Sequence, residues 1–126
     1  MSRSGVDLCD DIRRSILHIR NYLEDYTVGK ALPVVYMFDF KTQDAVIYRL
    51  MIIGEAGGDL IERHSPAVAK CSTADYDLES ALKQAARMRD LLIHHHWTVD
   101  ADVIRQTAEG DLSRLRVAIE ALKKDL

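Results

Sequence analysis

The sequence has few of the features that mark membrane, secreted or disulfide-bonded proteins. It contains no uncharged apolar run of the roughly 18 residues that a membrane-spanning helix needs. Its short polar start, residues 1–5, does not resemble a signal peptide. The two cysteines, Cys9 and Cys71, form no Cys-x-x-Cys pair. We therefore expect a cytoplasmic protein that has both thiols reduced and does not contact a membrane.

Proline and alternating apolar–polar stretches are also scarce, which argues against a β-sheet protein. Only two prolines occur in 126 residues, and the apolar residues recur mostly at spacings of three and four. This length suits one domain with one hydrophobic core. We expect residues 1–126 to form a single all-α domain, an antiparallel four-helix bundle with one or more short extra helical turns.

Charge of one sign is not in excess. Seventeen basic and 20 acidic residues give a net charge of −3. The chain as a whole is therefore not a general binder of polyanions. Any contact with a nucleic acid would have to be local, through a few clustered cations.

Apolar stripes at helical spacing predict the main helices. These helices cover about residues 6–26, 42–64 and 78–96, and a fourth starts after Asp100 and can bend at Gly110. Thr42 and Asp100 suit N-cap positions. Residues 34–40 are expected to form a short helical turn, and residues 66–77 a loop.

The second predicted helix has more apolar surface and more glycine than one helix contact needs. Two adjacent stripes run along it: Val46, Leu50, Ile53, Gly57 and Leu60, and Ile47, Met51, Gly54, Gly58 and Ile61. One explanation is burial on two sides, against the core and against a second protomer. Each glycine costs about 1 kcal/mol relative to alanine inside a helix. Gly54, Gly57 and Gly58 therefore indicate close approach of another backbone, and a bend or break at residues 57–58 is the alternative.

The stretch from Arg89 to Asp100 combines an arginine, three successive histidines at 94–96 and the only tryptophan, Trp97. Cations are stabilised at the C-terminal end of a helix, so these residues also have a purely structural explanation. Successive histidines on a helix point in different directions, so we expect no metal site there and no cofactor. We expect Trp97 to pack into the core or at the corner between two helices, and a platform for stacking RNA bases is the alternative.

Arg89-x4-His94 resembles the Arg-x4–6-His motif of the HEPN superfamily (higher eukaryotes and prokaryotes nucleotide-binding), and more narrowly that of its HepT-like branch. The matching residues are Arg89, His94, Trp97, Val99 and Asp100, preceded by the blocks 42–46 and 52–56. Members of this branch sit beside a minimal nucleotidyltransferase in toxin–antitoxin pairs. The resemblance implies a homodimer with a composite cleft, RNA as substrate and a cognate minimal nucleotidyltransferase antitoxin as partner.

The resemblance also implies RNA cleavage without a metal, in a type VII-like toxin–antitoxin system. His94 would act as acid or base because imidazole changes charge near neutrality. Arg89 would stabilise the developing charge on the phosphate. Residues five apart are separated by roughly 140° around an ideal helix, so these two would not share a face. Either the helix loosens before His94, or two protomers combine their motifs.

Two positions depart from the HepT-like pattern. Asp90 replaces the usual asparagine, and His96 replaces the tyrosine that the partner enzyme can AMPylate, so AMPylation of that tyrosine is impossible here. Asp90 lies four residues before His94, where its carboxylate would favour the protonated imidazole but would also oppose RNA phosphate. We expect Asp90, His96 and Glu55 to support the cleft. For Glu55, a buried ion pair with an arginine such as Arg89 and a solvated side chain are both open.

Two functions are consistent with these patterns. The first is a metal-independent endoribonuclease toxin that acts through Arg89 and His94. The alternative, motivated by Asp90 and His96, is a catalytically weak or inactive HEPN module that binds a nucleotidyltransferase partner or a nucleotide. A helical dimer with a purely structural role is a third interpretation.

Overall fold

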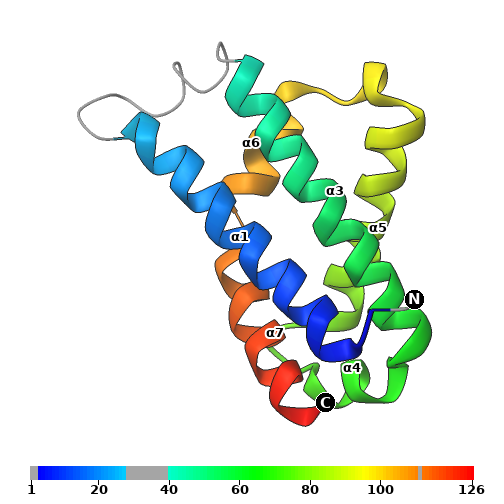
Figure 1. The fold of residues 1–126 in the computed structure, drawn as a ribbon. Helices are drawn as coiled ribbons and strands as arrows, with labels where there is room; N and C mark the ends of the chain where they lie inside the picture. The colour runs from blue at the N-terminus through cyan, green and yellow to red at the C-terminus, as the bar shows by residue number, and fades with distance from the viewer. Residues whose placement is uncertain (1–2, 28–39, 111) are drawn as a thin grey trace.

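The computed structural model describes residues 3–27, 40–110 and 112–126 (Figure 1). These residues form helices and no strand, which confirms the predicted all-α class. The elements are α1 (Gly5–Thr27), α3 (Phe40–Arg63), α4 (Ser65–Cys71), α5 (Leu78–His94), the 3-10 helix η1 (His96–Thr98), α6 (Ala101–Glu109) and α7 (Leu112–Asp125). No helix in the described part of the chain is both long and apolar enough to span a bilayer.

The three longest helices lie side by side, with α3 between α1 and α5 (Figure 1). The fourth long helix, α7, packs against α1. The core lies where these helices meet, and it contains Val46, Leu50, Ile53 and Leu60, the apolar side chains of the first predicted stripe of α3. The 3.6-residue period of the sequence therefore identified the buried faces correctly.

Helix α1 begins with a reciprocal cap. The Asp7 backbone N–H donates to Ser4 Oγ at 3.1 Å, and the Ser4 N–H donates to Asp7 Oδ2 at 3.4 Å. This exchange satisfies two N–H groups that the first turn of a helix leaves without partners. Helix α3 begins at Phe40, so Thr42 lies buried in its first turn and is not the N-cap that the sequence suggested.

The loop expected at residues 66–77 is partly wrong, because Ser65–Cys71 forms α4. Pro66 stands in the first turn of α4, where its missing N–H needs no partner. Val68 is buried against the core and anchors the short helix. The next helix starts as expected, and the Asp77 carboxylate accepts the Ser80 backbone N–H at 3.0 Å as its N-cap.

The remaining boundaries also differ in detail. Helix α5 ends at His94, two residues earlier than predicted, and the chain continues into η1. Where one helix with a bend at Gly110 was expected, α6 ends at Glu109 and a second helix, α7, begins at Leu112. The start of α6, directly after Asp100, is as expected. The short helical turn expected over residues 34–40 lies, apart from Phe40, outside the described residues.

The glycines of α3 mark a close contact with α5, as one of the two interpretations required. Helix α3 is continuous through residues 57–58, so the alternative of a break is wrong. A Cβ atom at Gly54 would overlap Arg89 Cβ and lie 2.5 Å from the Ala85 carbonyl oxygen. A Cβ at Gly58 would lie 3.6 Å from Ala86 Cβ. The second stripe of α3 is therefore used, at these two glycines, against α5 of the same chain.

Both thiols are free, as expected. Burial raises the pKa of the Cys9 thiol to about 11. Burial also raises the pKa of Cys71, and so does the hydrogen bond that its Sγ donates to Asp125 Oδ2 at 3.4 Å. Both cysteines are therefore neutral thiols near pH 7, which makes them poor nucleophiles.

Candidate active site at the end of α5

Arg89 is positioned by the contact between α3 and α5. Its Cβ lies directly over Gly54, where any side chain would overlap it. Its side chain is 34% exposed, so the base of the side chain is packed while the guanidinium reaches the surface. The close contact at Gly54 of α3 therefore determines the position of Arg89 on α5.

The Arg89 guanidinium is engaged by its neighbour. Its Nη1 donates to Asp90 Oδ1 at 3.1 Å, and the Asp90 side chain is 64% exposed. The structure records no ion pair between Asp90 and His94 in the described residues, although their spacing would allow one. Asp90 therefore acts on the arginine of the motif, where the sequence suggested an action on the histidine.

His94 is the last residue of α5, and its side chain is exposed. The helix stays regular up to this point, because the His95 N–H still donates to the Leu91 carbonyl at 2.8 Å. The interpretation in which the helix loosens before His94 is therefore wrong. Arg89 and His94 belong to different faces of one regular helix, roughly 140° apart.

The turn after α5 presents an aromatic cluster to solvent. Trp97 is 70% exposed, which overturns the expectation that it anchors the core or the corner. The ring centroids of His95 and His96 each lie 5.4 Å from that of Trp97, and both imidazoles meet the indole edge-to-face, at 71° and 84°. The hydrophobic core of the described residues does not include the Trp97 indole.

Glu55 takes no part in a buried ion pair. Its side chain is exposed on α3, one residue after the glycine that contacts Arg89. Among the described residues Arg89 pairs with Asp90 and not with Glu55. Of the two interpretations that the sequence left open for Glu55, the solvated side chain is the one that the structure supports.

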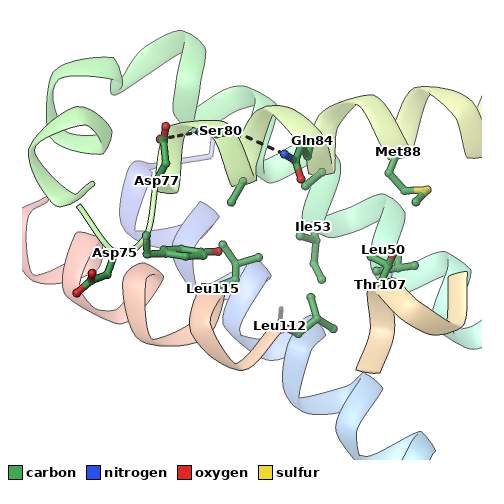
Figure 2. A pocket seen from close by; sticks show the side chains of 13 residues that line it. Leu50, Ile53, Asp75, Asp77, Ser80, Gln84, Met88, Thr107, Leu112 and Leu115 are labelled. Carbon is green, nitrogen blue, oxygen red and sulfur yellow. Dashed lines mark hydrogen bonds between the residues drawn. The ribbon is translucent and has the colours of Figure 1, made fainter. Parts of the chain in front are cut away.

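A cavity in the described part of the chain lies elsewhere (Figure 2). It encloses about 360 Å³ among side chains of α3, α5, α6, α7 and the segment before α5. None of the predicted site residues lines it. Its described lining includes Asp75 and Asp77 and no lysine, arginine or histidine. The chemistry-bearing side chains are thus on the outer surface, at the end of α5 and in η1.

The arrangement at this end of α5 can serve acid–base chemistry on a phosphodiester. It offers one arginine, three exposed imidazoles and one exposed indole within nine residues. The described residues include no group of three histidine, cysteine, aspartate or glutamate side chains that could hold a metal ion. The sequence identified these residues by type, but it did not reveal the Gly54 contact, the Asp90 pair or the exposure of Trp97.

Comparisons with known proteins agree with the motif. Residues 12–122 match the family described as "Ribonuclease HepT-like". The chain is 32% identical to a "Probable ribonuclease HepT" of Thermococcus cleftensis, over 98% of this chain and 100% of that protein. No solved structure matches the chain significantly. A match over most of the chain and a full-length relative lead to one conclusion: this chain belongs to the HepT-like ribonuclease family of the HEPN superfamily.

Proposed function

We propose that this protein is a metal-independent endoribonuclease, the toxin of a type VII-like toxin–antitoxin system, and that it acts in the cytoplasm. The observation that carries the proposal is the Arg89-x4-His94 motif at the solvent-exposed end of α5, in a chain that belongs to a ribonuclease family. Arginine and histidine are the side chains that phosphodiester cleavage without a metal requires.

In the proposed reaction, neutral His94 accepts the proton of an RNA 2′-hydroxyl. The 2′-oxygen attacks the adjacent phosphorus, and the bond from phosphorus to the 5′-oxygen breaks. A protonated imidazole, His96, gives its proton to the departing 5′-oxygen. Arg89 stabilises the extra negative charge on the phosphate as the new bond forms. The products are a 2′,3′-cyclic phosphate and a 5′-hydroxyl.

The proposed active form is a homodimer of antiparallel four-helix bundles, each built from α1, α3, α5 and α7, with a composite cleft between the protomers. The regular geometry of α5 supports this form, because Arg89 and His94 face different directions on one helix. Two α5 ends facing each other would bring the arginine of one protomer to the histidine of the other. The glycine stripe of α3 does not add support, because α5 already covers it at Gly54 and Gly58.

We further propose that a cognate minimal nucleotidyltransferase is the antitoxin. Because His96 stands where the family has an AMPylated tyrosine, neutralisation would rest on tight binding or on another acceptor. A second candidate function is a catalytically weak or inactive HEPN module that binds this partner or a nucleotide. The ion pair from Asp90 favours it, since it occupies the guanidinium that RNA phosphate would need.

The test is cleavage of RNA by the purified protein in EDTA, with wild type compared with Arg89→Ala and His94→Ala. Acid–base catalysis typically contributes about 10²- to 10⁴-fold, so the histidine variant should lose that much activity. The loss of the arginine should cost about 10²-fold or more. No cleavage by wild type, or cleavage that survives both substitutions, would favour the binding module.

A further inference from the structure

Trp97 is a large apolar side chain that the fold leaves in solvent on a hydrogen-bonded turn. It is 70% exposed. Its turn is fixed by backbone bonds from the Thr98 N–H to the His95 carbonyl at 2.9 Å and from the Val99 N–H to the His96 carbonyl at 3.3 Å. The Thr98 hydroxyl also donates to the His95 carbonyl, at 2.8 Å. The backbone of this hydrogen-bonded turn has little conformational freedom to lose when a ligand covers the ring.

The side chains around Trp97 are the ones that the proposed chemistry uses. The ring centroid of His96 lies 5.4 Å from that of the Trp97 indole, and His94 lies three residues before Trp97 in the chain. The imidazoles of His95 and His96 meet the indole edge-to-face. Trp97 is nevertheless 70% exposed, so most of the indole surface stays open to solvent. A flat group could therefore lie on the indole while its phosphate lies beside the histidines.

The overall charge of the chain adds no attraction for RNA, so a contact that does not depend on charge would contribute to affinity. The chain carries a net charge of −3, and the motif arginine is paired with Asp90. Stacking of a base on an aromatic side chain does not depend on charge, and it typically changes affinity by about 5- to 150-fold for each base.

We propose that Trp97 stacks with an unpaired base next to the scissile phosphate, so that the protein selects single-stranded RNA. A base in a duplex has both faces covered by its neighbours and cannot lie on the indole. The inference rests on the proposed nuclease function, because it places the base beside the residues that would cut the chain. Trp97 binds and positions the substrate, and it transfers no proton.

Trp97 is the only tryptophan, so its fluorescence reports directly on this contact. The probe is a short 2′-O-methyl oligouridylate, which cannot be cut because its 2′-oxygen carries no proton. Titration into wild-type protein should quench the fluorescence. An abasic oligomer of the same length has the same phosphates without bases and should not quench it. The same strand paired with 2′-O-methyl oligoadenylate should also fail to quench.

Substitutions separate stacking from a structural role. Trp97→Ala should weaken oligouridylate binding by about 5- to 150-fold, raise KM for single-stranded RNA and leave the melting temperature unchanged, whereas Trp97→Phe should retain most of the affinity. The matched control is Phe40→Ala, which removes another exposed aromatic side chain, 76% exposed at the start of α3. This control should bind oligouridylate like wild type.

The outcomes distinguish the inference from the proposed function. Quenching that survives in Arg89→Ala and His94→Ala, with no cleavage by wild type, would support stacking and reject the nuclease. Cleavage that requires Arg89 and His94, with equal quenching by the abasic oligomer and full activity of Trp97→Ala, would reject stacking alone. A Trp97→Ala protein that binds RNA normally and fails to dimerise or to hold the nucleotidyltransferase would assign the indole to a protein interface and overturn the inference.

Discussion

At the scale of single residues, Asp90 has the clearest consequence for activity. Its carboxylate accepts a hydrogen bond from Arg89 Nη1 at 3.1 Å, so the arginine that would bind a phosphate is already partnered. The pair is largely exposed, with side chains 34% and 64% accessible, and an exposed pair is weak. RNA phosphate can therefore displace Asp90, but the negative charge remains close by.

Replacing Asp90 with asparagine should strengthen RNA binding. Asp90→Asn removes the competing charge, and we expect single-stranded RNA to bind roughly two- to fivefold more tightly at low salt, with a smaller gain at high salt. The measurement is affinity and kcat/KM at two salt concentrations. Glu79→Gln is the matched control, because it makes the same charge change at the other end of α5, where Glu79 pairs with Lys83 at 3.1 Å. An equal gain in both variants would mean that only net charge matters.

At the scale of elements, the contact between α3 and α5 determines where Arg89 stands. Gly54 faces Ala85 and Arg89 so closely that no side chain fits, whereas Gly58 has ordinary room beside Ala86. The two glycines lie four residues apart on the same helix, but only Gly58 has space for a larger side chain. Stability and activity should respond differently at the two positions.

Gly54→Ala should destabilise the protein by about 1–3 kcal/mol, because the new methyl group forces α5 away from α3. It should also lower RNA cleavage, since Arg89 moves with α5. Gly58→Ala should be neutral or stabilise by up to about 1 kcal/mol, because alanine favours a helix and its Cβ is in ordinary contact. Urea unfolding and a cleavage assay on both variants test this. Similar stability of the two variants would show that the helices are not locked at Gly54.

The contact between α1 and α7 includes an interhelical ion pair that responds to pH. Lys123 Nζ donates to Asp10 Oδ1 at 2.7 Å. This hydrogen bond is the largest cause that lowers the pKa of Asp10. Burial opposes it, and the charges of Lys123, Arg13 and Arg14 each lower the pKa further by a smaller amount. Because the folded-state pKa is depressed, the stabilisation is present above the unfolded pKa and is lost as the pH falls through the folded one.

Asp10→Asn should therefore lower the melting temperature at pH 7, and the gap from wild type should close as the pH falls below the ordinary aspartate pKa of about 3.9. The check is a set of thermal melts across that range. Asp11→Asn removes the neighbouring carboxylate, which pairs with Arg3 at 2.6 Å and does not bridge two helices. It should have the smaller effect at pH 7. A gap that stays constant down to the lowest pH would contradict the assignment.

At the scale of the whole molecule, the different directions of Arg89 and His94 on one regular helix bear on whether the active site forms between two protomers. If the cleft is composite, each protomer supplies the arginine to one cleft and the histidine to the other. A heterodimer of Arg89→Ala and His94→Ala then contains one cleft with both groups intact. A site within one chain would leave both protomers inactive.

Co-expression of the two inactive variants with different tags, followed by purification through both tags, should give a heterodimer that cleaves RNA, while each variant alone does not. Light scattering on the same samples measures the mass, which should be that of a dimer. A clean monomer, or an inactive heterodimer of the correct mass, would remove the support for a composite cleft.

The helices and their buried faces could be predicted because the information is local. The apolar spacing along residues 6–26 and 42–64 identified α1 and α3 to within about two residues at each end. The start of α4 could not be predicted in this way, since proline both breaks helices and suits their first turn, and the burial of Val68 decides between these. The residues of the candidate site were identifiable by type and spacing, with the family resemblance behind them.

By itself the sequence determined the buried faces of the main helices, the conflict that three glycines create inside α3, and which arginine and histidine match the family motif. These follow from periodicity, backbone cost and residue chemistry, all of which act within a few positions of the chain. Only the tertiary structure decided that Gly54 lies against Arg89, that Arg89 pairs with Asp90 and not with Glu55, and that Trp97 is exposed. Those outcomes depend on how α3 and α5 pack together and on what the completed core leaves outside, and no local pattern specifies either.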